Sequence, residues 1–318
     1  MTTRVRVPAS SSNLGSGFDC VGIAIDRWLT ASVTIGHGAS GGGFSIRRQG
    51  RLSTVKVRPD QDLFTRGFRA ACAAGGAEAP SGVTIEATSD IPVGYGLGSS
   101  AAAIIAGALL ADSALGLGLS RAQILEIGTT IEGHPDNVAP AIHGGAVLSV
   151  HTSAGVVSSS LRIAPGLELL IAVPPFPNDT KAARAALPPT VPHPEAAVAA
   201  SRAAALVQGL ATGDGKLLTA ALDDVLHVPY RRGEIYGYDV VVKAAIEAGA
   251  YGATLSGAGS AILAIAPRDR GPDVATALLC AWRAEGVTAE LIRFTQPVPG
   301  ATVSETRPRV HPVSTESL

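Results

Sequence analysis

The chain has 318 residues, enough for two domains of ordinary size, and 16% of them are charged. Its formal net charge of −1 argues against a nucleic-acid partner, and three widely spaced cysteines argue against a disulfide framework or a CxxC metal site. The longest apolar stretch, residues 101–111, is too short to cross a bilayer, and no basic N-terminus leads into an apolar segment. We therefore expect a cytoplasmic protein with no membrane attachment.

The first half of the chain alternates between strand and helix patterns. Alternating apolar and polar residues predict strands at 4–8, 33–35, 44–46, 83–88 and 144–150. Helices are predicted at 64–74, at 100–115, and after Ser120, which forms a capping box with Gln123 in a helix that stops at Gly133. The segment 100–115 is apolar on every face, so that helix is expected to be buried.

The second half predicts another mixed domain. Its expected elements are a strand at 167–173, helices at 195–210, near Lys216, at 239–248 and at 272–285, a hairpin around Ser256–Gly259, and a strand at 289–294. This order favours an α+β sandwich over a parallel doubly wound sheet. We expect an N-terminal domain at 1–155, a C-terminal domain at 156–295, and a loose tail at 296–318 that is rich in Pro, Ser and Thr.

A glycine-rich loop carries the strongest chemical signal. Gly94, Gly96 and Gly98 alternate along the loop, and Ser99 and Ser100 then open the apolar helix. Alternate glycines let a backbone curl its N–H groups inward, and a helix N-terminus favours an anion, so this pattern predicts a phosphate cradle. The loop is not a Walker A motif, because no Gly-Lys-Ser/Thr follows, and the third glycine of a dinucleotide fingerprint would fall on Ser99. A glycine-rich turn before a buried helix is the structural alternative.

Six blocks of the chain resemble the homoserine kinases of the galactokinase, homoserine kinase, mevalonate kinase and phosphomevalonate kinase (GHMP) superfamily. In chain order they are Val7–Asp19, Pro92–Ala102, His134–Pro140, Thr180–Arg184, His227–Arg231 and Ser256–Ser260. The resemblance covers residues 4 to about 295. It implies a two-domain GHMP kinase fold, with an N-terminal ATP-binding domain like ribosomal protein S5 domain 2 and a C-terminal ferredoxin-like α+β domain.

The resemblance also implies an ATP and Mg²⁺ site. The expected nucleotide-binding residues are Asp62 near the adenine, together with Pro92, Gly94, Gly96, Leu97, Gly98, Ser99, Ser100 and Ala101 around the phosphates. Ser100 and Glu126 would bind Mg²⁺, because this family places its magnesium carboxylate on the helix that starts after Ser120 and Mg²⁺ needs only one or two protein oxygens. From the residues alone, Glu126 belongs to a solvated helix face.

The acceptor side is implied in the same way. Its expected residues are Asn13, Asp19, His134, Asn137, Thr180, Arg184, Arg231 and Gly257. Asp19 would meet the acceptor hydroxyl, and the two arginines would bind its carboxylate with their planar forks. Asn137 stands where mevalonate-type relatives carry an aspartate base, so the hydroxyl would be oriented and the transition state stabilised without a strong base. Asp136, on an extended segment, would point to the opposite face. The expected catalytic set is Asp19, Ser100, Glu126 and Asn137.

The activity implied is ATP-dependent phosphorylation of the side-chain hydroxyl of L-homoserine, a step towards threonine. Homodimers are common in such a family, although no helix of this chain shows an interface pattern. Three alternatives stay open from the sequence. They are a related kinase for L-threonine or another small hydroxy amino acid, a binding protein that has lost catalysis, and a dinucleotide-binding oxidoreductase.

Overall fold

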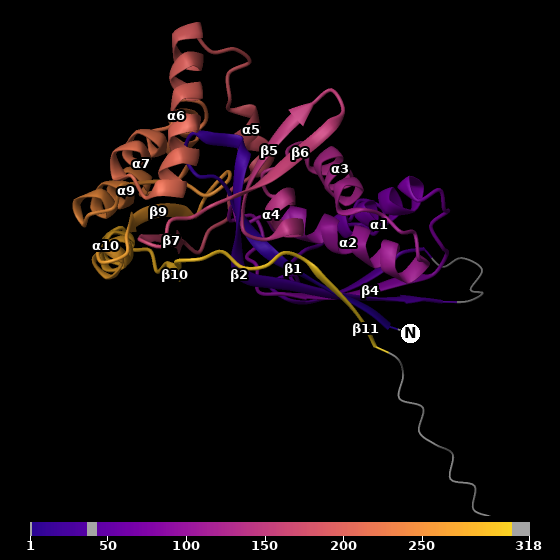
Figure 1. The fold of residues 1–318 in the computed structure, drawn as a ribbon. Helices are drawn as coiled ribbons and strands as arrows, with labels where there is room; N and C mark the ends of the chain where they lie inside the picture. The colour runs from indigo at the N-terminus through magenta and orange to yellow at the C-terminus, as the bar shows by residue number, and fades with distance from the viewer. Residues whose placement is uncertain (1, 37–42, 307–318) are drawn as a thin grey trace, which may run out of the picture.

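The computed structural model describes residues 2–36 and 43–306. A seven-stranded sheet forms the first half, with strand order β11-β1-β2-β4-β3 and a β5–β6 hairpin attached to β2 (Figure 1). Its strands are β1 Thr2–Asn13, β2 Gly17–Ile35, β3 Ser45–Gly50, β4 Val83–Ser89, β5 Ala146–Thr152, β6 Gly155–Leu161 and β11 Thr302–Thr306. Neighbours are antiparallel except β3 and β4. Strand β1 alternates as predicted, burying Val5 and Val7 while Arg4 and Arg6 are exposed.

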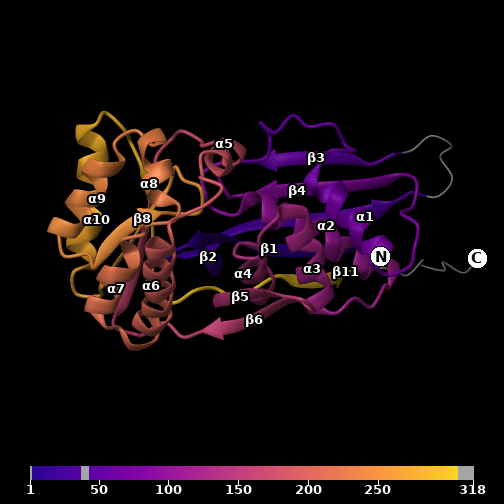
Figure 2. The ribbon, with the colours of Figure 1, turned by 90° about the horizontal axis from the view of Figure 1, so that it is seen from above.

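Helices α1 Leu63–Ala74, α2 Ser99–Leu115, α3 Arg121–Glu132 and α4 Val138–His143 lie together on one face of this sheet (Figures 1 and 2). Helix α2 is buried along most of its length, as its uniform apolarity predicts. It crosses α1 closely at Gly67, where an added Cβ would lie 2.1 Å from the Ile104 carbonyl oxygen. The Ser120–Gln123 capping box and the Gly133 stop of α3 are confirmed.

The second half contains a four-stranded sheet of order β10-β7-β9-β8. The strands are β7 Leu167–Val173, β8 Gly252–Leu255, β9 Ile262–Pro267 and β10 Glu290–Phe294. The helices are α5 Thr180–Ala185, α6 His193–Thr212, α7 Gly215–Leu222, α8 Val228–Arg231, α9 Tyr238–Glu247 and α10 Gly271–Ala284, with a 3-10 turn at Arg232–Glu234. Alternate residues of β7 enter different cores. Leu169 and Ile171 pack in the core that runs into the first half, and Leu170 packs with α9 and α10.

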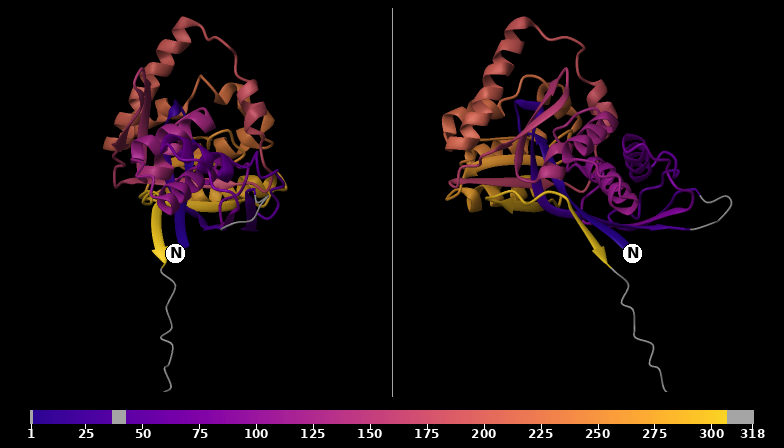
Figure 3. Two further views of the ribbon diagram at one scale, coloured as in Figure 1. Left: turned by 90° about the vertical axis from the view of Figure 1, so that its right-hand side faces the viewer. Right: turned by 45° about the vertical axis from the view of Figure 1, so that its right-hand side comes forward.

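Two predicted boundaries need correction. Residues 155–161 pair with β5, so a division at residue 155 would cut the β5–β6 hairpin, and the N-terminal part of this sheet continues to Leu161. The segment expected to be a loose tail includes β11, which pairs with β1 through contacts such as Val5 with Val303. Figure 3 shows β11 running beside the N-terminal strand. Residues 307–318 of the predicted tail lie outside the described residues. In the described ranges, no helix is long and apolar enough to cross a membrane.

Candidate active site

The glycine loop enters α2 in the conformation that its glycines allow. Gly94, Gly96 and Gly98 all have positive φ angles, of 87°, 75° and 66°. Gly98 is the N-cap of α2, so the first N–H groups of a 17-residue helix are left for an external acceptor. The loop is held from the second half, where the Ser256 hydroxyl donates to the Gly96 carbonyl at 2.6 Å. A Cβ at Gly96 would lie 2.0 Å from the Ser256 carbonyl oxygen, so only glycine fits.

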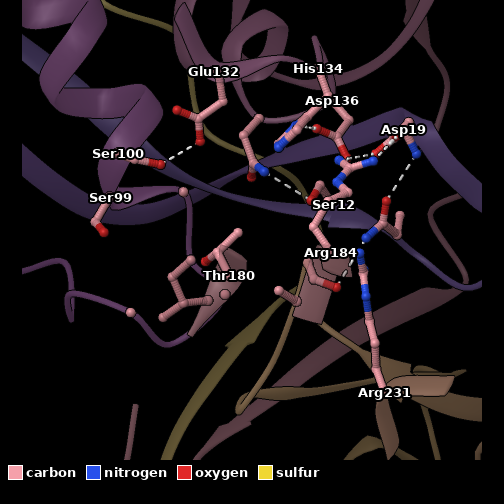
Figure 4. Close-up of a pocket in the computed structure, with 18 of the residues that line it drawn as sticks. Ser12, Asp19, Ser99, Ser100, Glu132, His134, Asp136, Thr180, Arg184 and Arg231 are labelled. Carbon is pink, nitrogen blue, oxygen red and sulfur yellow. Dashed lines mark hydrogen bonds and ion pairs between the residues drawn. The ribbon is translucent and has the colours of Figure 1, made fainter. Parts of the chain in front are cut away.

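A cavity of about 240 Å³ lies at this helix N-terminus, between the two halves of the chain (Figure 4). Most of the predicted site residues line it. They are Asn13, Asp19, Gly94, Gly96, Leu97, Gly98, Ser99, Ser100, His134, Asn137, Thr180, Arg184, Arg231 and Gly257. Ser12, Val93, Glu132, Asp136 and Ala258 line it as well, and the sequence prediction omitted them. Pro92 and Ala101 are buried beside the loop and do not reach the cavity.

Glu132, not Glu126, faces Ser100, so the predicted pairing of Ser100 with Glu126 is wrong. The Ser100 hydroxyl donates a hydrogen bond to Glu132 Oε1 (Figure 4). Six residues earlier on α3, Glu126 points to a different side of the helix, where it accepts from the Val156 N–H at 3.1 Å. Burial raises the pKa of the Glu132 carboxyl, and the hydrogen bond from Ser100 opposes that shift. A neighbouring cation would stabilise this charge, so the pair fits a hard divalent metal ion.

Asp62 lines a second cavity of about 140 Å³, which shares Val93, Ser99 and Ser100 with the first. Its carboxylate is already engaged at both oxygens. One accepts the Phe64 N–H at 2.9 Å and so caps α1, and the other forms an ion pair with Arg48. Leu52, Val55, Val57 and Phe64 make much of the remaining wall apolar. The structure therefore places Asp62 beside the phosphate-loop cavity as a helix cap, which the prediction of an adenine contact did not anticipate.

Asn137 is held at both ends of its amide. Its Oδ1 accepts from the Ser10 hydroxyl and its Nδ2 donates to the Ser12 hydroxyl, each at 2.9 Å. Asn13 forms a similar bridge, donating to the Gly257 carbonyl at 3.0 Å and accepting from the Asp19 N–H at 3.0 Å. The serines of β1 and the two asparagines thus tie together segments that are more than 120 residues apart in the sequence.

An acidic cluster with one histidine lies next to these asparagines. Ligand atoms of Asp19, His134 and Asp136 all lie within 4.8 Å of one another. His134 Nδ1 is hydrogen-bonded to Asp136 Oδ1. Burial lowers the pKa of the His134 imidazole, but the hydrogen bond and charge of Asp136 outweigh it, so the pKa is raised. The prediction that Asp136 points to the face opposite Asn137 is wrong, because residues 134–137 turn into α4 instead of extending, and both residues line the cavity.

Two arginines reach the cavity from the second half (Figure 4). Arg184 donates to both oxygens of Asp19, at 2.6 and 2.9 Å, and its side chain is 42% exposed. Arg231 is only 3% exposed and donates to the Ala183 carbonyl and to His227 Nδ1. The guanidinium carbon of each lies 5.3 Å from the centre of the Phe18 ring. The cavity therefore has an anion cradle at one end and both signs of charge at the other.

Comparison with known proteins identifies the family. The chain matches the model of the GHMP kinases N terminal domain at residues 62–145 and that of the GHMP kinases C terminal at 204–284. It is 40% identical over 287 residues to a homoserine kinase of Picosynechococcus, covering 90% of this chain and 93% of that protein. A homoserine kinase of Gloeobacter violaceus is also 40% identical, with 87% and 92% covered. The chain belongs to the homoserine kinase family of the GHMP kinases.

Solved structures show the same fold. A homoserine kinase from Cytophaga hutchinsonii superposes with a TM-score of 0.83 at 27% identity, covering 95% of this chain and 97% of that one. Mevalonate kinase from L. major, at 15% identity, shares the fold with a TM-score of 0.64. The predicted two-domain GHMP kinase fold of class α+β is confirmed, and family membership makes the chain a phosphotransferase that uses ATP and a hydroxyl acceptor.

Proposed function

We propose that this chain transfers the γ-phosphoryl group of ATP to the side-chain hydroxyl of L-homoserine, which yields O-phospho-L-homoserine and ADP. The relatives named homoserine kinase support this reading at 36–40% identity over most of the chain. The observation that carries it is one cavity with the α2 N-terminus at one end and the Asp19–Arg184 pair with Arg231 at the other. A phosphate donor and a small zwitterion fit these two ends.

In this proposal the phosphate end works through its backbone. The loop Gly94–Ser100 presents N–H groups to the phosphates, and the α2 dipole adds to their attraction for negative charge. Ser100 and Glu132 would hold Mg²⁺, which neutralises charge on the phosphates when it is bound. The apolar walls of the Asp62 cavity suit the nucleobase, because flat rings favour apolar contacts. Pro92 and Ala101 are buried at the two ends of the loop.

The acceptor end works through charged side chains. An amino acid carries an ammonium and a carboxylate, and the cavity offers Asp19 with Asp136 for the first and Arg231 for the second. Arg184 reinforces the carboxylate end once its pair with Asp19 opens. Asp19 also orients the acceptor hydroxyl, and Asn137 holds the adjoining wall in place through its two serine contacts. Catalysis by position and charge needs no strong base here.

The proposal is tested by ADP release from Mg·ATP with a panel of acceptors: L-homoserine, L-threonine, L-serine, 4-hydroxythreonine, mevalonate and galactose. We expect a strong preference for L-homoserine. Turnover of another hydroxy amino acid instead would keep the mechanism and reassign the acceptor. ATP binding without turnover of any of the six would favour an acceptor outside this panel or a binding protein.

A further inference from the structure

Arg231 is a buried cation whose fork is left open. Its Nε donates to the Ala183 carbonyl at 3.0 Å and one terminal nitrogen lies 3.3 Å from His227 Nδ1. Within the described residues, no carboxylate lies within ion-pair distance of this guanidinium, although its side chain lines the cavity. Arg184, by contrast, has both terminal nitrogens on Asp19. An arginine that is to receive a ligand carboxylate needs a free fork, and a buried charge still needs a counter-charge.

His227 connects Arg231 to the interior. A guanidinium can only donate, so His227 Nδ1 must accept, and its Nε2 lies 3.2 Å from the Gly15 carbonyl, which can only accept. The imidazole is therefore neutral, with its proton on Nε2. Its ring also stacks on Phe18, with the ring centres 5.1 Å apart. Hydrogen bonds and stacking fix the imidazole, and the imidazole fixes the orientation of Arg231.

Asp224 lies on the other side of His227. Its side chain is fully buried, and its Oδ2 lies 3.8 Å from His227 Nε2. The same oxygen accepts the N–H groups of Leu226, His227 and Val228 at 2.7–3.1 Å, the turn that opens α8. Its Oδ1 has no hydrogen-bond partner among the residues that the structure describes. Local hydrogen bonding therefore satisfies half of this carboxylate and leaves its charge to be balanced from further away.

We propose that Asp224 is a positioning residue for the acceptor carboxylate site. It holds the start of α8 and supplies the counter-charge of Arg231 across the neutral His227, without occupying the arginine fork. The inference rests on the proposed function, because it assigns the open fork to the carboxylate of the acceptor amino acid. Burial lowers the pKa of the Arg231 guanidinium and Arg184 adds to this effect, while Asp19, Asp136 and Asp224 oppose it. Of the four charged residues that act on Arg231, only Asp224 does not line the cavity.

The decisive experiment compares two acceptors in Asp224→Asn. L-homoserine carries the carboxylate, and 3-aminopropan-1-ol is the same molecule without it. We expect KM for L-homoserine to rise on the order of 10- to 100-fold, as for loss of one partner of a buried charge pair. The kcat/KM for 3-aminopropan-1-ol and the KM for ATP should change less than about threefold. The matched control is Asp223→Asn, an exposed neighbour that pairs with Arg202 at 2.7 Å and should leave every parameter unchanged.

A double-variant cycle separates action through Arg231 from a general effect on the fold. Arg231→Met combined with Asp224→Asn should be no worse for L-homoserine than Arg231→Met alone. The proposal would be overturned if the effects of the two substitutions on KM for L-homoserine multiplied in the double variant. It would also be overturned if Asp224→Asn lowered kcat/KM equally for both acceptors, or if it left KM for L-homoserine unchanged. His227→Phe keeps the stacking on Phe18 and removes the acceptor nitrogen, so it should show the same split between the acceptors, even if Asp224→Asn does not fold.

The same two single variants and their double variant can be compared by urea unfolding, a measurement that does not depend on catalytic activity. If Asp224 balances the charge of Arg231, the double variant should unfold at a higher urea concentration than the two single shifts predict together. Additive shifts would overturn the proposal even if the wild type turned over no acceptor. A wild type that is inactive with L-homoserine would refute the proposed function alone.

Discussion

The two ends of the pocket are built from different parts of the chain. The phosphate end is backbone, shaped by the positive φ angles of Gly94, Gly96 and Gly98 over one short loop. The acceptor end is made of side chains, such as Asp19 and Arg184, which are paired across 165 residues of sequence. At the phosphate end, an added side-chain atom would clash with the backbone and displace the loop. At the acceptor end, loss of one charged side chain removes only part of the binding free energy. Substitutions at the two ends should therefore differ in size and in which substrate they affect.

The phosphate end should show the largest effect. In Gly96→Ala the new Cβ would lie 2.0 Å from the Ser256 carbonyl oxygen, at a φ of 75° that L-residues disfavour. The loop must move, and we expect kcat/KM for ATP to fall by about 10³-fold, equivalent to roughly 4 kcal/mol. The measurement is initial rate against ATP concentration at saturating L-homoserine.

Gly116→Ala is the control for that substitution. Gly116 has a similar φ of 63°, at the end of α2, and a Cβ there meets no atom within 4 Å. It should cost about 1 kcal/mol of folding stability from the left-handed backbone, and no activity. A Gly96→Ala enzyme within tenfold of the wild type would mean that the loop geometry is not critical.

Glu132→Gln should have the next largest effect. It removes the charge that faces Ser100, and we expect kcat to fall about 10²- to 10³-fold, as for loss of one preorganised electrostatic contact. The Mg²⁺ concentration for half-maximal rate should rise. Glu126→Gln on the same helix should behave like the wild type, because Glu126 contacts the Val156 backbone and not the pocket. The opposite ranking of the two variants would restore Glu126 as the metal ligand.

These differences explain which parts of the site the sequence could predict. The phosphate end is local, so its glycine spacing, capping helix and positive φ angles all leave a signature within ten residues. The elements with a clear local pattern were also predictable, such as the uniformly apolar α2 and β7 and the capped helix α3. Thr180, Arg184 and Arg231 were placed only through resemblance to a family, because nothing local distinguishes a pocket arginine from a surface one.

The misses have physical causes. Glu126 and Glu132 lie on one helix with one local pattern, and only the position of α3 against α2 decides which of them meets Ser100. Asp136 was misplaced because four residues that look extended form a turn into α4. The pairing of β11 with β1 joins chain ends about 300 residues apart, and the composition of that segment carries no trace of it. Asp224 had no motif at all, since its role follows from three backbone N–H groups and a neighbouring histidine.

The two arginines should separate within the acceptor end. Arg231→Met leaves the acceptor carboxylate without its buried donor, and we expect KM for L-homoserine to rise about 100-fold. Arg184→Met affects a half-exposed side chain that pairs with Asp19, and a rise of about tenfold or less is expected, because exposed ion pairs contribute little. Steady-state kinetics with L-homoserine varied at saturating ATP would measure both. Equal effects would remove the distinction between an open and an occupied fork.

The smallest effect concerns the pH dependence of stability at the acceptor end. The pKa of His134 is raised above its ordinary 6.5 by Asp136, so folding favours the protonated imidazole. This stabilisation is complete below pH 6.5 and is lost as the pH rises through the folded pKa. His134→Gln should therefore lower the urea midpoint at pH 5.5 and have less effect at pH 8.5. The loss in free energy of unfolding should be larger at pH 5.5 by about 1 kcal/mol.

His227 lies at the same end of the pocket, and its contribution to stability depends on pH in the opposite direction to that of His134. Burial lowers its pKa, so its contribution to stability is present at high pH and is lost as the pH falls. A wild-type profile alone would mix the two imidazoles, and only the difference between the wild type and His134→Gln isolates the first. His151→Gln, on an exposed part of β5, controls for loss of any histidine. A difference that grew towards pH 8.5 would mean that Asp136 does not hold a protonated His134, and that the acidic cluster is free to receive the acceptor ammonium without displacing an internal cation.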